Sequence, residues 1–132
     1  MKTLRTSLLL ALIASSVACG YSSKAATPPT AGTVPAISEL APDSVASGSG
    51  EFILTVNGSN FSGGSVVNWN GTMQTTTFVS ANQLTAAIAA TDLESPATVN
   101  ITVTNPAVAG TGQYGSGGTT AETSNSMSFT IN

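Results

Sequence analysis

The side chains that could carry out chemistry in this chain are few. Its 132 residues include one cysteine, three basic residues, six acidic residues and no histidine. Without histidine a Ser-His-Asp triad cannot form, and a single cysteine allows neither an intrachain disulfide nor a Cys/His zinc site. Serine and threonine are abundant, but no general base accompanies any of them. We therefore expect no enzyme, no cofactor and no metal centre, and look for sites of attachment or contact.

Cys19 is the residue whose surroundings specify a modification most clearly. Lys2 and Arg5 precede an apolar run at 8–14, and small residues suited to a cleavage site come just before the cysteine. This pattern predicts a secretory signal peptide spanning 1–18. The apolar stretch is far shorter than the roughly 20 residues that cross a bilayer, so it is not expected to remain as an anchor.

The sequence Ser16-Val17-Ala18-Cys19 resembles the lipobox of bacterial lipoproteins, in which the cysteine is acylated. Each buried methylene of an acyl chain contributes about 0.8 kcal/mol, so several chains would hold the protein to membrane lipid. The alternative is plain secretion with Cys19 left as a free thiol. We favour lipidation because an unpaired exported thiol is a liability. Gly20 is unlike an acidic inner-membrane retention signal, which favours the outer membrane or cell surface.

A spacer is expected between the cysteine and the folded part, over residues 19–34. Gly20–Thr33 has little to bury and contains Pro28-Pro29, which predicts an extended, disordered tether. Beyond Cys19 the chain holds six acidic residues and one basic residue, a net charge of −5. Because phosphate recognition needs cationic surface, we expect no nucleic-acid partner.

The remaining sequence predicts an all-β fold. Thr, Ser, Asn and Gly make up 60 of the 132 residues, which disfavours helices. Apolar residues alternate with polar ones in short segments, and Asn70-Gly71 is a strong signal for a two-residue hairpin. Spacings near ten residues indicate a sandwich of about seven antiparallel strands. The expected strands are Pro35–Leu40, Glu51–Asn57, Ser65–Trp69, Thr72–Val79, 84–88, 99–103 and 127–131. The larger core members are expected to be Phe52, Phe61, Trp69, Phe78 and Phe129.

From Pro35 to Asn132 the chain resembles the IPT/TIG domain, an immunoglobulin-like fold. The resemblance rests on an ordered set of short motifs. They are Leu40-x-Pro42, Gly50-x-Phe52-x-Leu54-x-Val56-x-Gly58-x-Asn60-Phe61, Trp69-Asn70-Gly71, Val99-x-Ile101-x-Val103-x-Asn105-Pro106 and Ser128-Phe129-x-Ile131. It implies that Gly58 permits a backbone turn, that Phe61 folds over the core, and that Pro106 ends a strand. The family occurs in proteins of many functions, so the resemblance implies a fold and not an activity.

One segment departs from the family pattern. Ala107–Asn125 inserts 19 residues before the last strand, whereas hairpin loops usually hold about 2–5. Its single aromatic residue, Tyr114, follows Gln113 in a Gly/Ser-rich stretch, a composition that suits contact with a partner. Two interpretations stay open: a recognition loop carrying Gln113 and Tyr114, or a solvated insertion with no role.

Two further candidates are weighed against simpler roles. Trp69 could stack on a sugar ring, but an aromatic on this strand of a sandwich is more often part of the core. Asp92-x-Glu94 could contribute to a calcium site, but calcium takes six or more oxygen ligands, so a solvated pair is expected. The same two carboxylates would be the pair required by a small hydrolase, the least favoured function.

The expected function is therefore that of a non-catalytic, exported and lipid-anchored domain of a bacterial cell envelope. It would contact a protein or glycan partner or support an envelope assembly. The alternative is an accessory carbohydrate-binding module that works beside a secreted polysaccharide-active enzyme.

Overall fold

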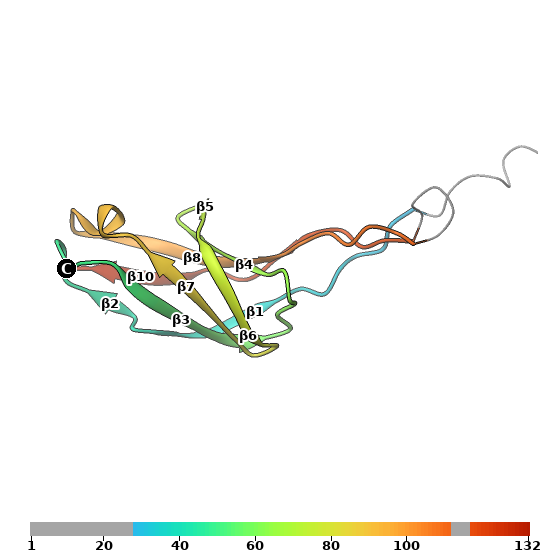
Figure 1. Cartoon of the computed structure of the whole chain (residues 1–132), viewed down its shortest axis with the longest axis horizontal. Coiled ribbons are helices and arrows are strands. Elements are labelled where there is room, and N and C mark those ends of the chain that lie inside the picture. The colour runs from blue at the N-terminus through green and yellow to red at the C-terminus, as the bar shows by residue number, and fades with distance from the viewer. Residues whose placement is uncertain (1–27, 112–116) are drawn as a thin grey trace, which may run out of the picture.

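Two β-sheets pack face to face and continue at one end into a thin extension (Figure 1). The computed structural model of the protein describes residues 28–111 and 117–132. The predicted all-β, immunoglobulin-like sandwich is confirmed. Of the ten strands in the described residues, seven correspond one to one to the expected segments, and the other three have two residues each.

The first sheet has four antiparallel strands in the order β1 (Ala36–Ala41), β3 (Phe52–Ser59), β7 (Gln83–Ile88) and β6 (Thr75–Ser80). The second has the order β2 (Ser44–Val45), β10 (Met127–Ile131), β8 (Ala97–Asn105), β4 (Val66–Trp69) and β5 (Thr72–Met73). In addition, β9 (Glu122–Thr123) pairs with the end of β8. The short pairing of β2 with β10 is parallel, and a 3₁₀ turn, η2 (Ala90–Leu93), joins β7 to β8.

The core lies between the sheets because alternate residues of each strand point inward. In β3, Leu54 and Val56 are fully buried, and in β7 Leu84 and Ile88 are. Burial of each such side chain contributes about 1.5–3 kcal/mol. The buried apolar residues of the described chain are Ile37, Leu40, Leu54, Val56, Phe61, Val67, Trp69, Leu84, Ala86, Ile88, Leu93, Val99, Ile101, Val103, Phe129 and Ile131.

The aromatic core is smaller than predicted. Phe61, Trp69 and Phe129 are buried, and Phe52 packs against them while partly exposed. Phe129 lies centrally, with its ring centroid 5.0 Å from that of Trp69 and 5.7 Å from that of Phe52. The prediction for Phe78 was wrong, since 41% of this residue is exposed. Its strand, β6, is the outer strand of the first sheet and has a neighbouring strand on one side only.

The expected strand Thr72–Val79 is divided between the two sheets. Its first two residues form β5 beside β4, and the chain then crosses to the first sheet as β6. Val67 allows this crossing: its carbonyl accepts from the amide of Gln74, and its amide donates to Thr76 Oγ1, each at 2.9 Å. The threonine hydroxyl thus takes the place of a strand partner, so β4 keeps its hydrogen bonds while the chain departs.

Gly58 is needed for a different reason from the one that the resemblance implied. It lies within β3, where a Cβ would collide with the carbonyl oxygen of Ala36 and approach Phe61 Cζ to 2.7 Å. The turn itself is made by Asn60, whose φ is 62°. The close packing of Phe61 over the core is confirmed, and so is the end of β8 before Pro106.

The connections between strands gather at two ends of the sandwich. We call the end that carries the loops 42–51, 70–71 and 89–96 the distal end. The opposite end, where the chain enters β1 and where 106–126 connects β8 to β10, is the proximal end (Figure 1). The C-terminal Asn132 is also distal, where its carbonyl oxygen accepts a 2.7 Å hydrogen bond from the amide of Ser47.

Candidate functional site

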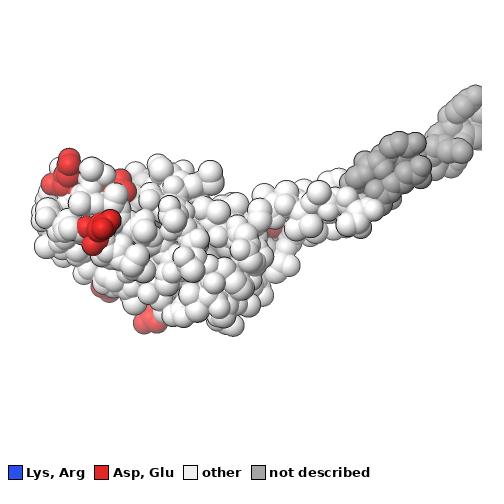
Figure 2. All heavy atoms as spheres, in the orientation of Figure 1, with Lys and Arg blue, Asp and Glu red and all other residues white. Residues whose placement is uncertain are grey.

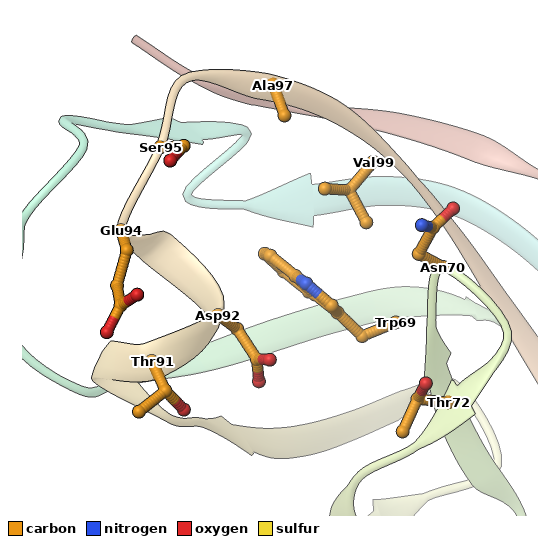
Figure 3. A pocket seen from close by; sticks show the side chains of 9 residues that line it. All are labelled: Trp69, Asn70, Thr72, Thr91, Asp92, Glu94, Ser95, Ala97 and Val99. Carbon is orange, nitrogen blue, oxygen red and sulfur yellow. The ribbon is translucent and has the colours of Figure 1, made fainter.

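A solvent-open hollow of about 400 Å³ lies at the distal end (Figure 3). Three connected parts of the chain form it: the end of β4 with its hairpin, the η2 turn, and the start of β8. Its lining is mostly polar, with two carboxylates, an amide and three hydroxyls around a small apolar area. The lining residues are Trp69, Asn70, Thr72, Thr91, Asp92, Glu94, Ser95, Ala97 and Val99.

Leu93 fixes the two carboxylates on the surface. Its side chain is fully buried in the core, between two exposed neighbours, Asp92 and Glu94. The turn is closed by a 3.0 Å hydrogen bond from the amide of Asp92 to the carbonyl of Ala89. A neighbouring loop adds a brace, because the amide of Gly48 donates to the Leu93 carbonyl at 2.7 Å. The acidic side chains are therefore held by a buried anchor.

The opposite rim of the hollow is built by the hairpin between β4 and β5. Asn70 and Gly71 have φ values of 49° and 90°, the left-handed pair that a type I′ turn needs, so the predicted hairpin is confirmed. The amide of Asn70 donates to the carbonyl of Asn100 at 2.9 Å, which ties the turn to β8. The hairpin holds the Asn70 side chain and the Thr72 hydroxyl at the rim (Figure 3).

Trp69 forms the floor of the hollow. It is 5% exposed and packs on Phe129, so the expected core role is confirmed and neither ring face is free to stack on a sugar. In Figure 3 the indole is seen nearly edge-on, with its nitrogen on the edge toward the viewer and the Asp92 carboxylate beside it. What Trp69 offers to solvent is thus one edge and one N–H group.

The side chains around the hollow have unused hydrogen-bonding capacity. Within residues 28–111 and 117–132, no side chain that lines it takes part in a hydrogen bond with another residue. Elsewhere in the same part of the chain, many Asn, Ser and Thr side chains do so, as Asn68 does with the hydroxyls of Thr102 and Thr104. The hollow therefore presents donors and acceptors that the fold does not need for itself.

The distal end is also the acidic end of the domain. Asp43, Glu51, Asp92 and Glu94 lie in its connections, and Figure 2 shows acidic atoms concentrated on the end farthest from the extension. All three basic residues of the sequence precede residue 28, so the described residues carry no positive side chain. An anionic ligand would find no counter-charge there, whereas neutral or cationic groups meet no such obstacle.

The proximal end is organised around the N-terminal segment and the long insertion. We call residues 28–33 together with 107–111 and 117–121 the stalk (Figure 1). Val108 pairs with Thr119 in an antiparallel bridge, and Thr30 pairs with the same Thr119 in a parallel one. The amide of Thr30 donates to the Gly118 carbonyl at 2.9 Å, and that of Thr120 donates to the Thr30 carbonyl at 3.0 Å. The two arms of the insertion thus form a ribbon, and the N-terminal segment pairs with it as a third segment.

Polar side chains lock this stalk to the sandwich. The Asn105 amide group, buried at the end of β8, donates to the carbonyls of Thr33 at 2.7 Å and Asn60 at 2.9 Å, and its oxygen accepts from Ser65 Oγ. A carboxylate oxygen of Glu122 accepts from the amide of Gly32 at 3.2 Å. The expectation of a disordered tether is therefore wrong for the last residues of the spacer, which are fastened to the domain, and the earlier spacer residues lie outside the described residues.

The structure can be compared with the sites expected from the sequence. Cys19 and the signal peptide lie outside the described residues, and so do Gln113 and Tyr114 of the insertion. The described parts of the insertion are paired, and it leaves the proximal end, the same end as the N-terminal segment. Asp92 and Glu94 are exposed, as expected of a solvated pair.

Trp69 and Asp92 belong to separate candidate sites in the sequence, yet they line one hollow in the structure. Asn70, Thr72 and Thr91 were not recognised as site residues at all. One signal could have found them. In a sandwich of antiparallel strands, alternate connections reach the same end, so the hairpin at 70–71 and the loop at 89–96 belong to one end, while their contact depends on the strand order.

Two general features of the described residues bear on function. None of their helices is long and apolar enough to cross a membrane. They also contain no group of three or more His, Cys, Asp or Glu side chains placed to hold a metal ion.

Comparison with known proteins gives one match. No curated protein and no solved structure matches the chain. The family model of the IPT/TIG domain matches residues 35–130, a range that begins just before β1 and ends within β10. Since this range covers most of the sequence and coincides with the two-sheet sandwich, the chain belongs to the IPT/TIG domain family.

Proposed function

We propose that this protein is an exported, non-catalytic contact domain that acyl chains on Cys19 anchor to a bacterial cell envelope, with its distal end directed away from the membrane. The family and the sandwich support a contact or structural role. The export signal and the cysteine support attachment.

The observation that carries the proposal is the separation of the two ends. The N-terminal segment that follows Cys19 enters at the proximal end, whereas the hollow and most of the carboxylates lie at the distal end (Figures 1 and 2). An anchored domain exposes to partners whatever lies farthest from its tether. The distal end is therefore the favoured contact surface, in place of the insertion that the sequence suggested.

The pairing in the stalk gives the insertion a role in orienting the domain. An unpaired spacer lets a domain turn toward the membrane in any orientation. Here Thr30 and Gly32 are bonded to the insertion, which extends the ordered domain toward its tether. The insertion then serves to hold the distal end outward.

A catalytic role is less well supported than contact. The hollow is open and both of its carboxylates, Asp92 and Glu94, are exposed to solvent. A hydrolytic carboxylate pair must flank the scissile bond from two sides, one as acid and the other as base or nucleophile, whereas Asp92 and Glu94 lie two residues apart on one exposed turn. A glycan-contact role, including that of an accessory carbohydrate-binding module, agrees better with the neutral and acidic lining.

The attachment can be tested on the exported protein. Its intact mass should exceed that of the 19–132 polypeptide by a diacylglyceryl group and an acyl chain, and Cys19→Ala should abolish this addition and the membrane association. An unmodified Cys19 in protein recovered from the envelope would contradict the anchor.

The orientation can be tested with two variants, each of which carries one new cysteine in addition to Cys19, at the distal end in one variant and at the proximal end in the other. Ser95→Cys places a crosslinking group beside the hollow, and Ser62→Cys places one at the proximal end. We expect envelope components to be crosslinked from position 95 and much less from position 62. Equal or stronger crosslinking from position 62 would contradict a distal contact surface.

A further inference from the structure

One hydrogen-bond donor of the core, the indole N–H of Trp69, faces the distal hollow without a partner among the described residues. Trp69 is 95% buried, and the edge that bears its nitrogen borders the hollow (Figure 3). Among the residues that the structure describes, none accepts a hydrogen bond from this N–H group. Because the hollow is open to solvent, this N–H group is accessible, and an acceptor from outside the chain can bind it.

The groups beside the indole demand the opposite chemistry. The Asp92 carboxylate can only accept hydrogen bonds, and it lines the same hollow as the Trp69 indole (Figure 3). The hydroxyls of Thr72, Thr91 and Ser95 can both donate and accept, as can the amide of Asn70. A complementary ligand must therefore bring an acceptor to Trp69 and a donor to Asp92 at neighbouring positions.

Neighbouring hydroxyl groups meet both demands, since each hydroxyl donates one hydrogen bond and accepts others. An ammonium or guanidinium group can pair with the carboxylate, but it has no lone pair for the indole N–H. A phosphate, sulfate or carboxylate could accept from the indole, but it would face Asp92 and Glu94 with no basic residue in the described chain to offset them. Among these classes, the lining selects a neutral polyhydroxylated ligand.

The size and the apolar part of the hollow agree with this choice. Its volume of about 400 Å³ is in the range of small-molecule sites. Ala97 and Val99 supply an apolar area beside the polar rim, against which the C–H face of a sugar ring can pack. Residues of the fold's own core fix the floor, so the site is largely formed before any ligand arrives.

We infer that the distal hollow binds a neutral sugar residue of a glycan, with a sugar oxygen accepting from Trp69 Nε1 and an adjacent hydroxyl donating to the Asp92 carboxylate. Thr72, Thr91 and Asn70 complete the ring of polar contacts. This inference rests on the proposed contact function and specifies the class of partner for it.

The single tryptophan makes the test direct. In a ¹H–¹⁵N spectrum the indole N–H of Trp69 gives one separate side-chain signal. The protein, purified in a detergent without sugar headgroups, is titrated with neutral trisaccharides of glucose, mannose, galactose and N-acetylglucosamine. A lysine-rich peptide and a sulfated trisaccharide serve as cationic and anionic probes.

We expect a saturable shift of the indole signal with at least one neutral trisaccharide and with neither charged probe. Asp92→Asn should weaken that binding about tenfold or more, because it replaces a charged acceptor. Asp43→Asn is the matched control, since this exposed carboxylate lies at the same end but does not line the hollow. It should leave the affinity unchanged.

An indole signal that moves with no neutral trisaccharide would overturn the inference, whether it stays still or moves only with the lysine-rich peptide. Equal loss of affinity in Asp43→Asn and Asp92→Asn would also overturn it, because the site would then be diffuse negative charge. The titration depends neither on Cys19 nor on an envelope partner. If no neutral sugar moves the indole signal, while Cys19 is acylated and crosslinks form at the distal end, sugar binding is refuted and the proposed function stands.

Discussion

The two ends of this domain use the same kinds of polar side chain for opposite purposes. At the proximal end the side chains of Asn105 and Glu122 form hydrogen bonds with the backbone of other segments of the chain. At the distal end Asn70 and Glu94 have equivalent groups and make no such bonds within the described residues. Polar side chains that are hydrogen-bonded within the chain hold the fold together. Polar side chains that the fold holds in place without such bonds are available to a partner.

Asn125 illustrates the proximal use most plainly. Its side-chain oxygen accepts from the amide of Ile37 at 2.8 Å, and its side-chain nitrogen donates to the Ile37 carbonyl at 3.0 Å. The amide side chain thus acts as a strand partner for β1, from a position just before β10 in the other sheet. Asn105 makes one such bond to the N-terminal segment, donating to the Thr33 carbonyl, so both asparagines lie where segments distant in sequence join the sandwich.

The largest effect is expected for Asn105→Ala. The substitution removes three hydrogen bonds from a buried position and leaves their partners unsatisfied. We expect a loss of about 2–4 kcal/mol in the free energy of unfolding, measured by denaturant titration. Asn100→Ala, at an exposed position of β8, should cost less than about 0.5 kcal/mol. Similar losses for the two variants would remove the structural role assigned to Asn105.

An intermediate effect is expected for Gly32→Val. A Cβ at this position would collide with the carbonyl oxygen of Thr120, so the N-terminal segment must leave the insertion. The amides of Thr30 and Thr120 should then exchange with solvent at least about tenfold faster, while the core keeps its protection, because local opening does not require global unfolding. Gly63→Ala is the control, since nothing lies within 4 Å of its Cβ position. Unchanged exchange in Gly32→Val would mean that the stalk pairing does not hold in solution.

The smallest effect on stability is expected at the distal end. Asp92→Asn and Glu94→Ala, singly or together, should change the free energy of unfolding by no more than about 0.5 kcal/mol, because neither side chain has a partner in the described chain. Glu122→Ala removes a carboxylate of the proximal end and should speed the exchange of the Gly32 amide. Thermal unfolding of the distal variants and amide exchange of Glu122→Ala measure the contrast. A distal variant as destabilised as Asn105→Ala would show that the hollow is structural.

Regular alternation made most of the strands predictable. Leu54 and Val56 point inward because successive side chains in a strand face opposite sides, which is a local property of the backbone. The hairpin at Asn70-Gly71 was equally local, since its turn type demands positive φ at both positions. The predicted burial of Phe78 was wrong because it was not a local property. The alternation in its strand is correct, but its burial depends on whether β6 is a central or an outer strand of the sheet.

The sequence by itself determined the strands, the hairpin and the composition of the surface, because these follow from side-chain spacing, backbone preference and charge counts. Only the tertiary structure decided that Thr30 pairs with an insertion some ninety residues further along the chain, and that Trp69 and Asp92 border one hollow. The physical reason is that both depend on which connections reach the same end of the sandwich. That arrangement is fixed by the pairing of strands distant in sequence and by burial of Leu93 in the shared core.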